Sequence, residues 1–211
     1  MNELSAADIR RLLDSLKNPV RLKVITTLTA EGYRQCPACE DTASLVEELA
    51  KGSNLLAFEE ISIIDEVATC KKLNVTRAPT VLFENLGIRY TGAPMGLETS
   101  PFIYTIYMAS TRKTIFSGML DDKLEKLKEA NLELIVTPTC PYCSQAALIE
   151  NSIVIDSNGR LNIDIIESYE NPDIARKYGV TGVPVTIING SERIEGVPSL
   201  ELLFNAIGYK T

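Results

Sequence analysis

Cys36-Pro37-Ala38-Cys39 and Cys140-Pro141-Tyr142-Cys143 are two copies of one tetrapeptide pattern, and they stand 104 positions apart. Two other motifs return in the same order: Val75-Thr76-Arg77-Ala78-Pro79 as Val180-Thr181-Gly182-Val183-Pro184, and Gly92-Ala93-Pro94 as Gly196-Val197-Pro198. Their offsets are 105 and 104 residues. Three motifs at nearly one offset indicate that the chain contains the same unit twice. We place these units at residues 1–117 and 118–211, with the junction at Ser117-Gly118.

Each unit is expected to follow the same order of strands and helices. A β-rich run ends just before each cysteine pair and a helix follows it, which predicts a strand–helix–strand crossover and then a hairpin. The expected strands are Val20–Leu28, Leu55–Phe58 and Thr80–Glu84 in the first unit, and Leu132–Thr137, Leu161–Ile166 and Val185–Ile188 in the second. Additional helices are expected at Ala6–Leu16 and Asp121–Ala130. The predicted fold class is α/β, with a mixed sheet in each unit and helices on both faces.

The position of the cysteines suits redox chemistry. Cys36 and Cys140 are expected at the start of a helix, where free backbone N–H groups and the helix dipole stabilise a thiolate. Proline is well tolerated in the first helical turn that follows them. Cys39 and Cys143 lie one turn further on, on the same helix face and within reach of a disulfide. We therefore expect the first cysteine of each pair to attack and the second to resolve the mixed disulfide.

Composition narrows the function further. The net charge is −7, so an acidic chain without a basic patch is not expected to bind nucleic acid. The absence of histidine excludes Cys-His nucleophilic pairs and histidine-containing zinc sites. No apolar run is long enough for a membrane helix and no secretory signal is evident, so we expect a cytoplasmic protein. No cofactor is expected beyond the redox-active disulfides.

Other interpretations of the motifs remain open at this point. Four cysteines could form one zinc site between the units, or the pairs could be inert structural disulfides. Pro79 and Pro184 begin their strands, either as a device for an edge strand or with a cis bond that exposes backbone beside the cysteines. Cys70 falls in an apolar helix and is expected to be an inert core residue.

The chain resembles the thioredoxin-fold superfamily, and its tandem arrangement is similar to the protein disulfide oxidoreductases of thermophilic archaea and bacteria. The Cys140–Cys143 motif is identical to the glutaredoxin motif, and Thr181-Gly182-Val183-Pro184 resembles the cis-proline segment of the superfamily. This resemblance implies two thioredoxin folds joined in one continuous sheet. It also implies that Val183-Pro184, Ala78-Pro79 and Tyr142 bind the client peptide beside catalytic cysteines.

Two departures from the family pattern concern the first unit. Cys36-Pro37-Ala38-Cys39 matches no family motif as closely, and Arg77 replaces the glycine found at position 182 of the second unit. The first centre is therefore expected to differ in potential, client or activity. Glu133 is a candidate for the buried acid that often relays protons in thioredoxins, and a surface position at a strand edge explains this residue as well.

The resemblance implies reduction, formation or isomerisation of disulfides in client proteins, with a flavoprotein similar to thioredoxin reductase as electron donor. One alternative is a dithiol electron-relay module that serves a dedicated peroxidase partner. Another is a glutathione-dependent glutaredoxin, and a third is a non-enzymatic zinc protein. Two intact cysteine pairs favour the protein disulfide oxidoreductase.

Overall fold

The protein was analysed as a computed structural model that describes residues 3–209. Its strands are β1 (Val20–Thr26), β2 (Leu56–Ser62), β3 (Thr80–Phe83), β4 (Ile88–Thr91), β5 (Ala130–Val136), β6 (Leu161–Glu167), β7 (Val185–Ile188) and β8 (Glu192–Glu195). Its helices are α1 (Ala6–Asp14), α2 (Pro37–Lys51), α3 (Val67–Lys72), the 3-10 helix η1 (Gly96–Glu98), α4 (Thr99–Thr111), α5 (Asp121–Leu124), α6 (Pro141–Asp156), α7 (Pro172–Lys177) and α8 (Leu200–Ile207). None of the helices in this part of the chain is long and apolar enough to cross a bilayer.

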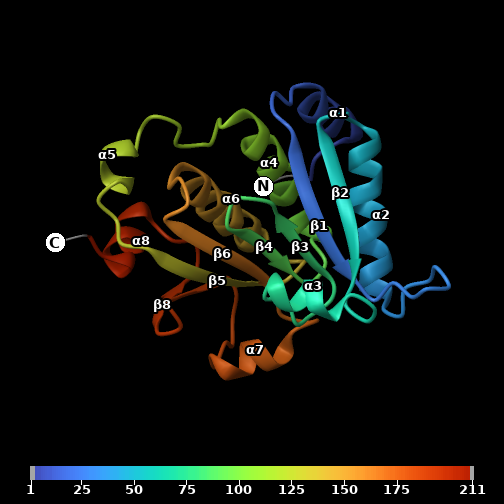
Figure 1. Ribbon diagram of the computed structural model, residues 1–211. Helices are drawn as coiled ribbons and strands as arrows, with labels where there is room; N and C mark the ends of the chain where they lie inside the picture. Colours follow the sequence, from blue (N-terminus) through green and yellow to red (C-terminus); the bar gives the residue numbers. More distant parts are fainter. Residues whose placement is uncertain (1–2, 210–211) are drawn as a thin grey trace.

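All eight strands belong to one mixed sheet, in the order β2-β1-β3-β4-β6-β5-β7-β8. Strand β1 pairs in parallel with β2 and antiparallel with β3, and β5 pairs in the same way with β6 and β7. The halves meet where β4 pairs in parallel with β6. Figure 1 shows β1 and β2 at the right and β5 and β6 towards the left of this sheet. The predicted α/β class and the continuous sheet are confirmed.

The two faces of the sheet are covered differently. One face carries a single apolar core that includes buried residues of α1, α2, α4, α6 and α8 from both halves. The opposite face carries two separate small clusters, one beside α3 around Ile61 and Cys70, and one beside α7 around Ile135 and Val185. The expectation that Cys70 is a core residue is confirmed, since its side chain is buried.

Several predicted boundaries were wrong, and distant contacts explain them. The expected helix Asp121–Ala130 ends at Leu124, because Lys128 N–H donates to Gly208 O and Ala130 begins β5 beside Leu161. Strand β2 continues past Phe58 through Glu59 and Glu60, since Lys23 and Arg34 neutralise these carboxylates. The alternation of apolar and polar residues along the strand does not indicate that Lys23 and Arg34 lie beside these carboxylates. The other ends move by one or two residues: β1 stops at Thr26, β5 spans Ala130–Val136, β3 stops at Phe83, β6 reaches Glu167 and α1 stops at Asp14.

The pairing pattern places both cysteine motifs at the same edge of the sheet. Strands β1, β4, β6 and β5 all run in one direction, because β3 reverses the chain between β1 and β4. The carboxyl ends of β1 and β5 therefore face the same way, and the motifs follow these ends. Four strand spacings separate β1 from β5, which is about 19 Å. The sheet thus presents the two cysteine pairs next to each other along one edge.

Candidate active site

The second centre has its first cysteine at the start of α6. Cys140 is the N-cap residue, and its Sγ accepts a hydrogen bond from the backbone N–H of Cys143 at 3.3 Å. Cys140 is partly exposed and Cys143 is completely buried. Burial is the largest cause that raises the pKa of Cys143, and its contact with Cys140 adds to it. One cysteine is therefore accessible to a client while the other lies behind it.

The cis-proline segment lies against this centre. The Val183–Pro184 peptide bond is cis, and the Sγ of Cys140 donates to the carbonyl oxygen of Val183 at 3.6 Å. These residues are 43 positions apart in the sequence. Tyr142 is 62% exposed at the beginning of α6, so its ring is available beside the cysteine. The structure thus brings Cys140, Cys143 and Val183-Pro184 together at one place.

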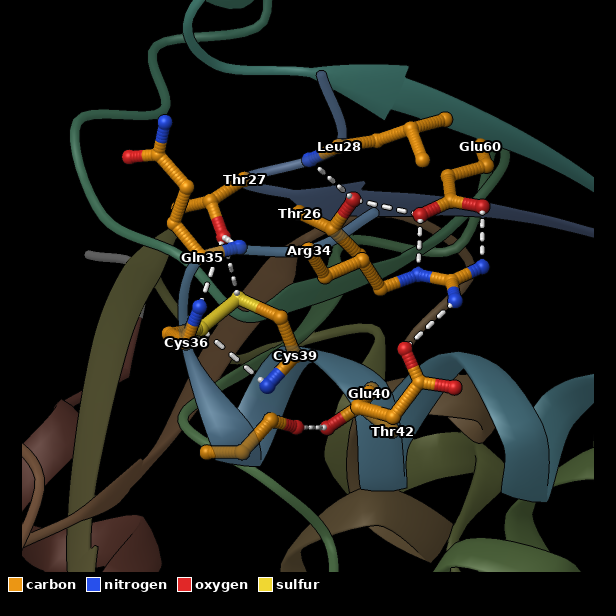
Figure 2. A network of polar contacts seen from close by, with 11 residues as sticks. Thr26, Thr27, Leu28, Arg34, Gln35, Cys36, Cys39, Glu40, Thr42 and Glu60 are labelled. Carbon is orange, nitrogen blue, oxygen red and sulfur yellow. Dashed lines mark hydrogen bonds and ion pairs between the residues drawn. A yellow bond between two sulfur atoms is a disulfide. The ribbon is translucent and has the colours of Figure 1, made fainter. Parts of the chain in front are cut away.

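The first centre repeats this arrangement with its cysteines oxidised. Cys36 is the N-cap residue of α2, its Sγ accepts from Cys39 N–H at 3.1 Å, and a disulfide joins the two residues. Cys36 is partly exposed and Cys39 is fully buried. The Ala78–Pro79 bond is cis as well. Figure 2 shows the disulfide at the beginning of α2, with the chain from Thr27 to Gln35 beside it.

The question of the two prolines is settled by the sheet. Pro79 and Pro184 precede β3 and β7, and both strands have a neighbour on each side. The edge-strand interpretation is therefore wrong, and both prolines have the cis bond.

A single zinc site shared by all four cysteines does not fit the fold. The two pairs follow β1 and β5, which are about 19 Å apart, whereas zinc–sulfur bonds are about 2.3 Å long. Within residues 3–209, no group of three or more Cys, Asp or Glu side chains is arranged to hold a metal ion.

Arg77 has a role that the sequence comparison of the two units did not suggest. Its guanidinium donates to Asp173 Oδ1 at 3.0 Å, to Asp173 Oδ2 and to Asn171 Oδ1 at 3.2 Å. These partners lie at the beginning of α7 in the other half. The residue beside the first cis-proline segment is thus tied to the second half by a half-exposed ion pair.

The buried acid near the second centre is Glu98, which the sequence did not reveal. Its side chain is 1% exposed, and neither carboxyl oxygen has a hydrogen-bond partner among the described residues. Burial raises the pKa of Glu98 to about 8, and its charge in turn raises the pKa of Cys143. No repeat signal could have found it, because the matching position in the second unit is Leu202.

Glu98 is held at this centre by a segment of the first half. Leu97 N–H donates to Pro138 O at 2.8 Å, and the hydroxyl of Ser144 donates to Leu97 O at 2.8 Å. Gly96 has a φ of +60°, and a Cβ there would collide with the carbonyl oxygen of Pro138. The first half therefore supplies one wall of the second centre.

Glu133, the candidate that the sequence offered for this acid, lies on the other side of the sheet. It alternates with Leu132 and Leu134, which belong to the core around Cys143, and Ile135 on its own face packs beside α7. Its carboxylate accepts a hydrogen bond from the hydroxyl of Tyr178. Of the two interpretations of Glu133, the proton relay for Cys143 is therefore wrong.

A second buried acid, Glu150, lies on α6 two turns after Cys143. Its Oε1 accepts from the hydroxyl of Thr186 at 2.6 Å, and its Oε2 is unpaired among the described residues. Burial raises its pKa to about 8. The corresponding residues of the first half are Val46 and Val81, so the pair is particular to the second half.

We expect the folding stability of the wild-type protein to decline towards alkaline pH, and Glu150→Gln to remove the part of that decline that comes from Glu150. A carboxyl whose pKa is about 8 in the folded chain and near 4.5 when unfolded stabilises the fold below pH 4.5, and this contribution is lost as pH rises to 8. The loss is about 4 kcal/mol between pH 5 and 9. Urea unfolding of both proteins at pH 5 and pH 9 measures it. An equal decline in the wild type and the variant would contradict this assignment.

Comparisons with known proteins agree with this geometry. The thioredoxin domain family matches residues 130–207. Thioredoxin from Methanocaldococcus jannaschii is 31% identical over 81 residues, which is 38% of this chain and 95% of that protein.

Two solved structures resemble the whole fold. A protein disulfide oxidoreductase from Aeropyrum pernix is 30% identical with a TM-score of 0.85, over 98% of this chain and 93% of that one. The alkylhydroperoxide reductase AhpF from Enterococcus faecalis shares the fold at 18% identity, with a TM-score of 0.83 over 96% of both chains. The chain therefore belongs to the thioredoxin family and is a thioredoxin-fold disulfide oxidoreductase.

Proposed function

We propose that this oxidoreductase exchanges disulfides with client proteins at both of its cysteine pairs, Cys140–Cys143 and Cys36–Cys39. The contact of Cys140 Sγ with Val183 O, beside the cis bond to Pro184, carries this proposal. A client segment that pairs with the backbone at Val183 would place its own sulfur next to Cys140. Val183, Pro184, Ala78 and Pro79 are accordingly the proposed client-binding residues, with Tyr142 beside them.

The reaction follows from the two positions in each pair. The thiolate of the accessible cysteine attacks a client disulfide, the client's first sulfur leaves as a thiolate, and a mixed disulfide forms. The buried cysteine then attacks the accessible one, the pair closes to a disulfide, and the second client sulfur leaves. Two electrons pass to the client, and solvent protonates the released thiolates. In reverse, the same steps form a disulfide in a client.

The partner that reduces the closed pair is proposed to be a flavoprotein similar to thioredoxin reductase. An electron-relay module that serves one peroxidase partner remains the second candidate. The fold that the chain shares with the alkylhydroperoxide reductase AhpF is compatible with it. An electron relay needs one reactive cysteine pair, whereas two cysteine pairs lie along one edge of this sheet. That arrangement favours action on client proteins.

We expect the wild-type protein to accelerate the reduction of insulin by dithiothreitol, and Cys36→Ser/Cys140→Ser to be as slow as dithiothreitol alone. Both attacking sulfurs are absent from the double variant, so no mixed disulfide can form. The turbidity of the precipitating insulin B chain measures the rate. The two single variants report the share of each centre, and Cys70→Ser is the control because Cys70 is buried away from both pairs. A wild-type protein that adds nothing to the rate would contradict general disulfide reductase activity and favour the relay.

A further inference from the structure

The first centre is preceded by an insertion that the second centre lacks. Strand β1 ends at Thr26 and leaves residues 27–35 before Cys36, whereas β5 ends at Val136 and leaves residues 137–139 before Cys140. The longer segment forms a small hairpin. Thr29 N–H donates to Tyr33 O at 2.9 Å, and Leu28 bridges to Arg34 in an antiparallel manner. The hairpin returns the chain to the sheet directly before Cys36.

An ion pair fixes the base of this hairpin. The guanidinium of Arg34 donates to both oxygens of Glu60 on β2, at 2.8 and 2.7 Å, and to Glu40 on α2 at 2.8 Å. Thr26 donates its hydroxyl to Glu60 and accepts from Leu28 N–H at 3.2 Å. Arg34 and Glu60 are 18% and 14% exposed. Two strands, the hairpin and α2 are therefore joined around one guanidinium, as Figure 2 shows.

The ion pair of Arg34 with Glu60 holds the hairpin so that the hydroxyl of Thr27 lies against the disulfide. Its Oγ1 accepts from Gln35 N–H at 2.9 Å and from Cys36 N–H at 3.1 Å. A hydroxyl has two acceptor positions and one hydrogen, so both acceptor positions are filled. The remaining hydrogen is directed to Cys39 Sγ, 3.5 Å away. Figure 2 shows Thr27 between these groups.

The two centres therefore differ in what contacts the buried sulfur. Thr137 occupies the place of Thr27 in the second half, yet within residues 3–209 no hydrogen bond joins its hydroxyl to Cys143. At the second centre the buried carboxyl of Glu98, whose own pKa burial raises to about 8, adds instead to the raised pKa of Cys143. A threonine hydroxyl does not ionise near neutral pH, so the first centre contains no equivalent titrating donor at Thr27.

We propose that Thr27 is a catalytic residue of the first centre, which stabilises Cys39 as a thiolate, and that Arg34 and Glu60 are its positioning residues. This inference rests on the proposed exchange at Cys36.

The reduction of the first centre takes two steps. A donor thiolate attacks Cys36 Sγ, a donor–Cys36 disulfide forms, and the Cys36–Cys39 bond breaks. Cys39 leaves as a thiolate that accepts the Thr27 hydrogen bond. A second donor thiolate then attacks the mixed disulfide, forming the donor disulfide and releasing the Cys36 thiolate. Solvent supplies two protons, and two electrons have passed to the pair.

The test is the reduction of Cys36–Cys39 by glutathione in Cys140→Ser/Cys143→Ser, which leaves only the first centre. We expect Thr27→Val to slow this reaction about tenfold, because the leaving thiolate loses its donor. Thr27→Ser keeps the hydroxyl and is expected to stay within about twofold of the parent. Alkylation at timed intervals and intact mass measure the rate. Corrected for glutathione ionisation, the parent rate should stay constant from pH 6 to 9.

Matched variants separate this role from a structural one. Thr137→Val in Cys36→Ser/Cys39→Ser, which keeps only the second centre, should change that centre's rate by less than about twofold. Thr27→Ala, which removes the hydroxyl without adding a methyl in its place, replaces Thr27→Val if the latter does not fold. A Thr27→Val rate within twofold of the parent, or a Thr27→Ser variant as slow as Thr27→Val, would overturn the inference. A parent whose pair neither glutathione nor dithiothreitol reduces would contradict the proposed function of this centre as well.

Discussion

Cys143→Ala is expected to remain covalently joined to its client through Cys140. In the proposed reaction the buried cysteine resolves the mixed disulfide as an intramolecular nucleophile, and such groups act with effective concentrations of about 10⁵ M or more. Without it, release depends on thiols in solution at about millimolar concentration, so we expect the complex to last at least about a thousand times longer. The protein should be combined with an oxidised client in the background Cys36→Ser/Cys39→Ser. Non-reducing electrophoresis then shows the complex.

The control for this trap is Cys140→Ala, which keeps the buried thiol and removes the accessible one. No complex is expected, because Cys143 is fully buried and its pKa is raised. A complex with Cys140→Ala, or none with Cys143→Ala, would reverse the assignment of the two sulfurs. The equivalent pair of variants at Cys36 and Cys39 gives the same test for the first centre.

The parts of the site predicted from the sequence are those whose function requires particular residue types at short spacing. A Cys-Pro-x-Cys stretch between a strand and a helix fixes where both sulfurs lie, because the helix start and the three-residue spacing leave little freedom. The positions of Val183 and Pro184 beside Cys140 followed from the repeat and the family resemblance, since nothing in a 43-residue separation reveals a contact.

The parts that were missed depend on contacts between distant segments. Glu98 is a charged residue just before a helix, a position that predicts exposure. Only the pairing of β4 with β6 and the contact of Leu97 with Pro138 bring it into the second centre. Likewise, Arg34 and Glu60 are far apart in sequence. A charged residue such as Glu60 indicates the end of a buried strand, and only its ion pair with Arg34 explains why β2 continues through it. Local patterns predict elements, whereas burial of a polar group depends on its partners.

The two centres are thus unequal despite their common origin as a repeat. The first half gives the second centre a carboxyl whose pKa burial raises to about 8, and the hairpin segment gives the first centre a hydroxyl that does not ionise near neutral pH. In the proposed reaction both sites exchange disulfides, and we expect their rates to respond differently to pH. We expect this difference to separate their roles more clearly than the tetrapeptide motifs, which differ only at Ala38 and Tyr142.

Glu98→Gln is expected to slow the release of a client from the second centre by about a hundredfold at pH 8.5. Cys143 must lose its proton before it attacks Cys140, and we expect the base to be the carboxylate of Glu98, which is buried, makes no hydrogen bond among the described residues and raises the pKa of Cys143. Because the pKa of Glu98 is about 8, the wild-type rate should rise as pH increases through 8, when the carboxylate form appears. Glutamine cannot accept the proton, so the variant should lack this rise. Single-turnover release of a client peptide in the background Cys36→Ser/Cys39→Ser, between pH 6 and 9.5, measures both profiles.

The opposite direction of exchange gives the internal control for Glu98. When a donor thiol opens the Cys140–Cys143 disulfide, Cys143 leaves and the protonated carboxyl of Glu98 can donate to it, so this rate should fall as pH rises through 8 once corrected for donor ionisation. Glu98→Asp retains the carboxyl, and partial recovery of both pH responses would distinguish proton transfer from support of the fold.

The stability of the fold gives an independent check on Glu98. Its raised pKa makes folding less favourable as pH rises from 4.5 to 8, and Glu98→Gln should remove that decline. A variant that loses the decline in stability yet keeps the wild-type pH profiles would show that Glu98 is buried beside Cys143 without serving it, and the base would then be solvent.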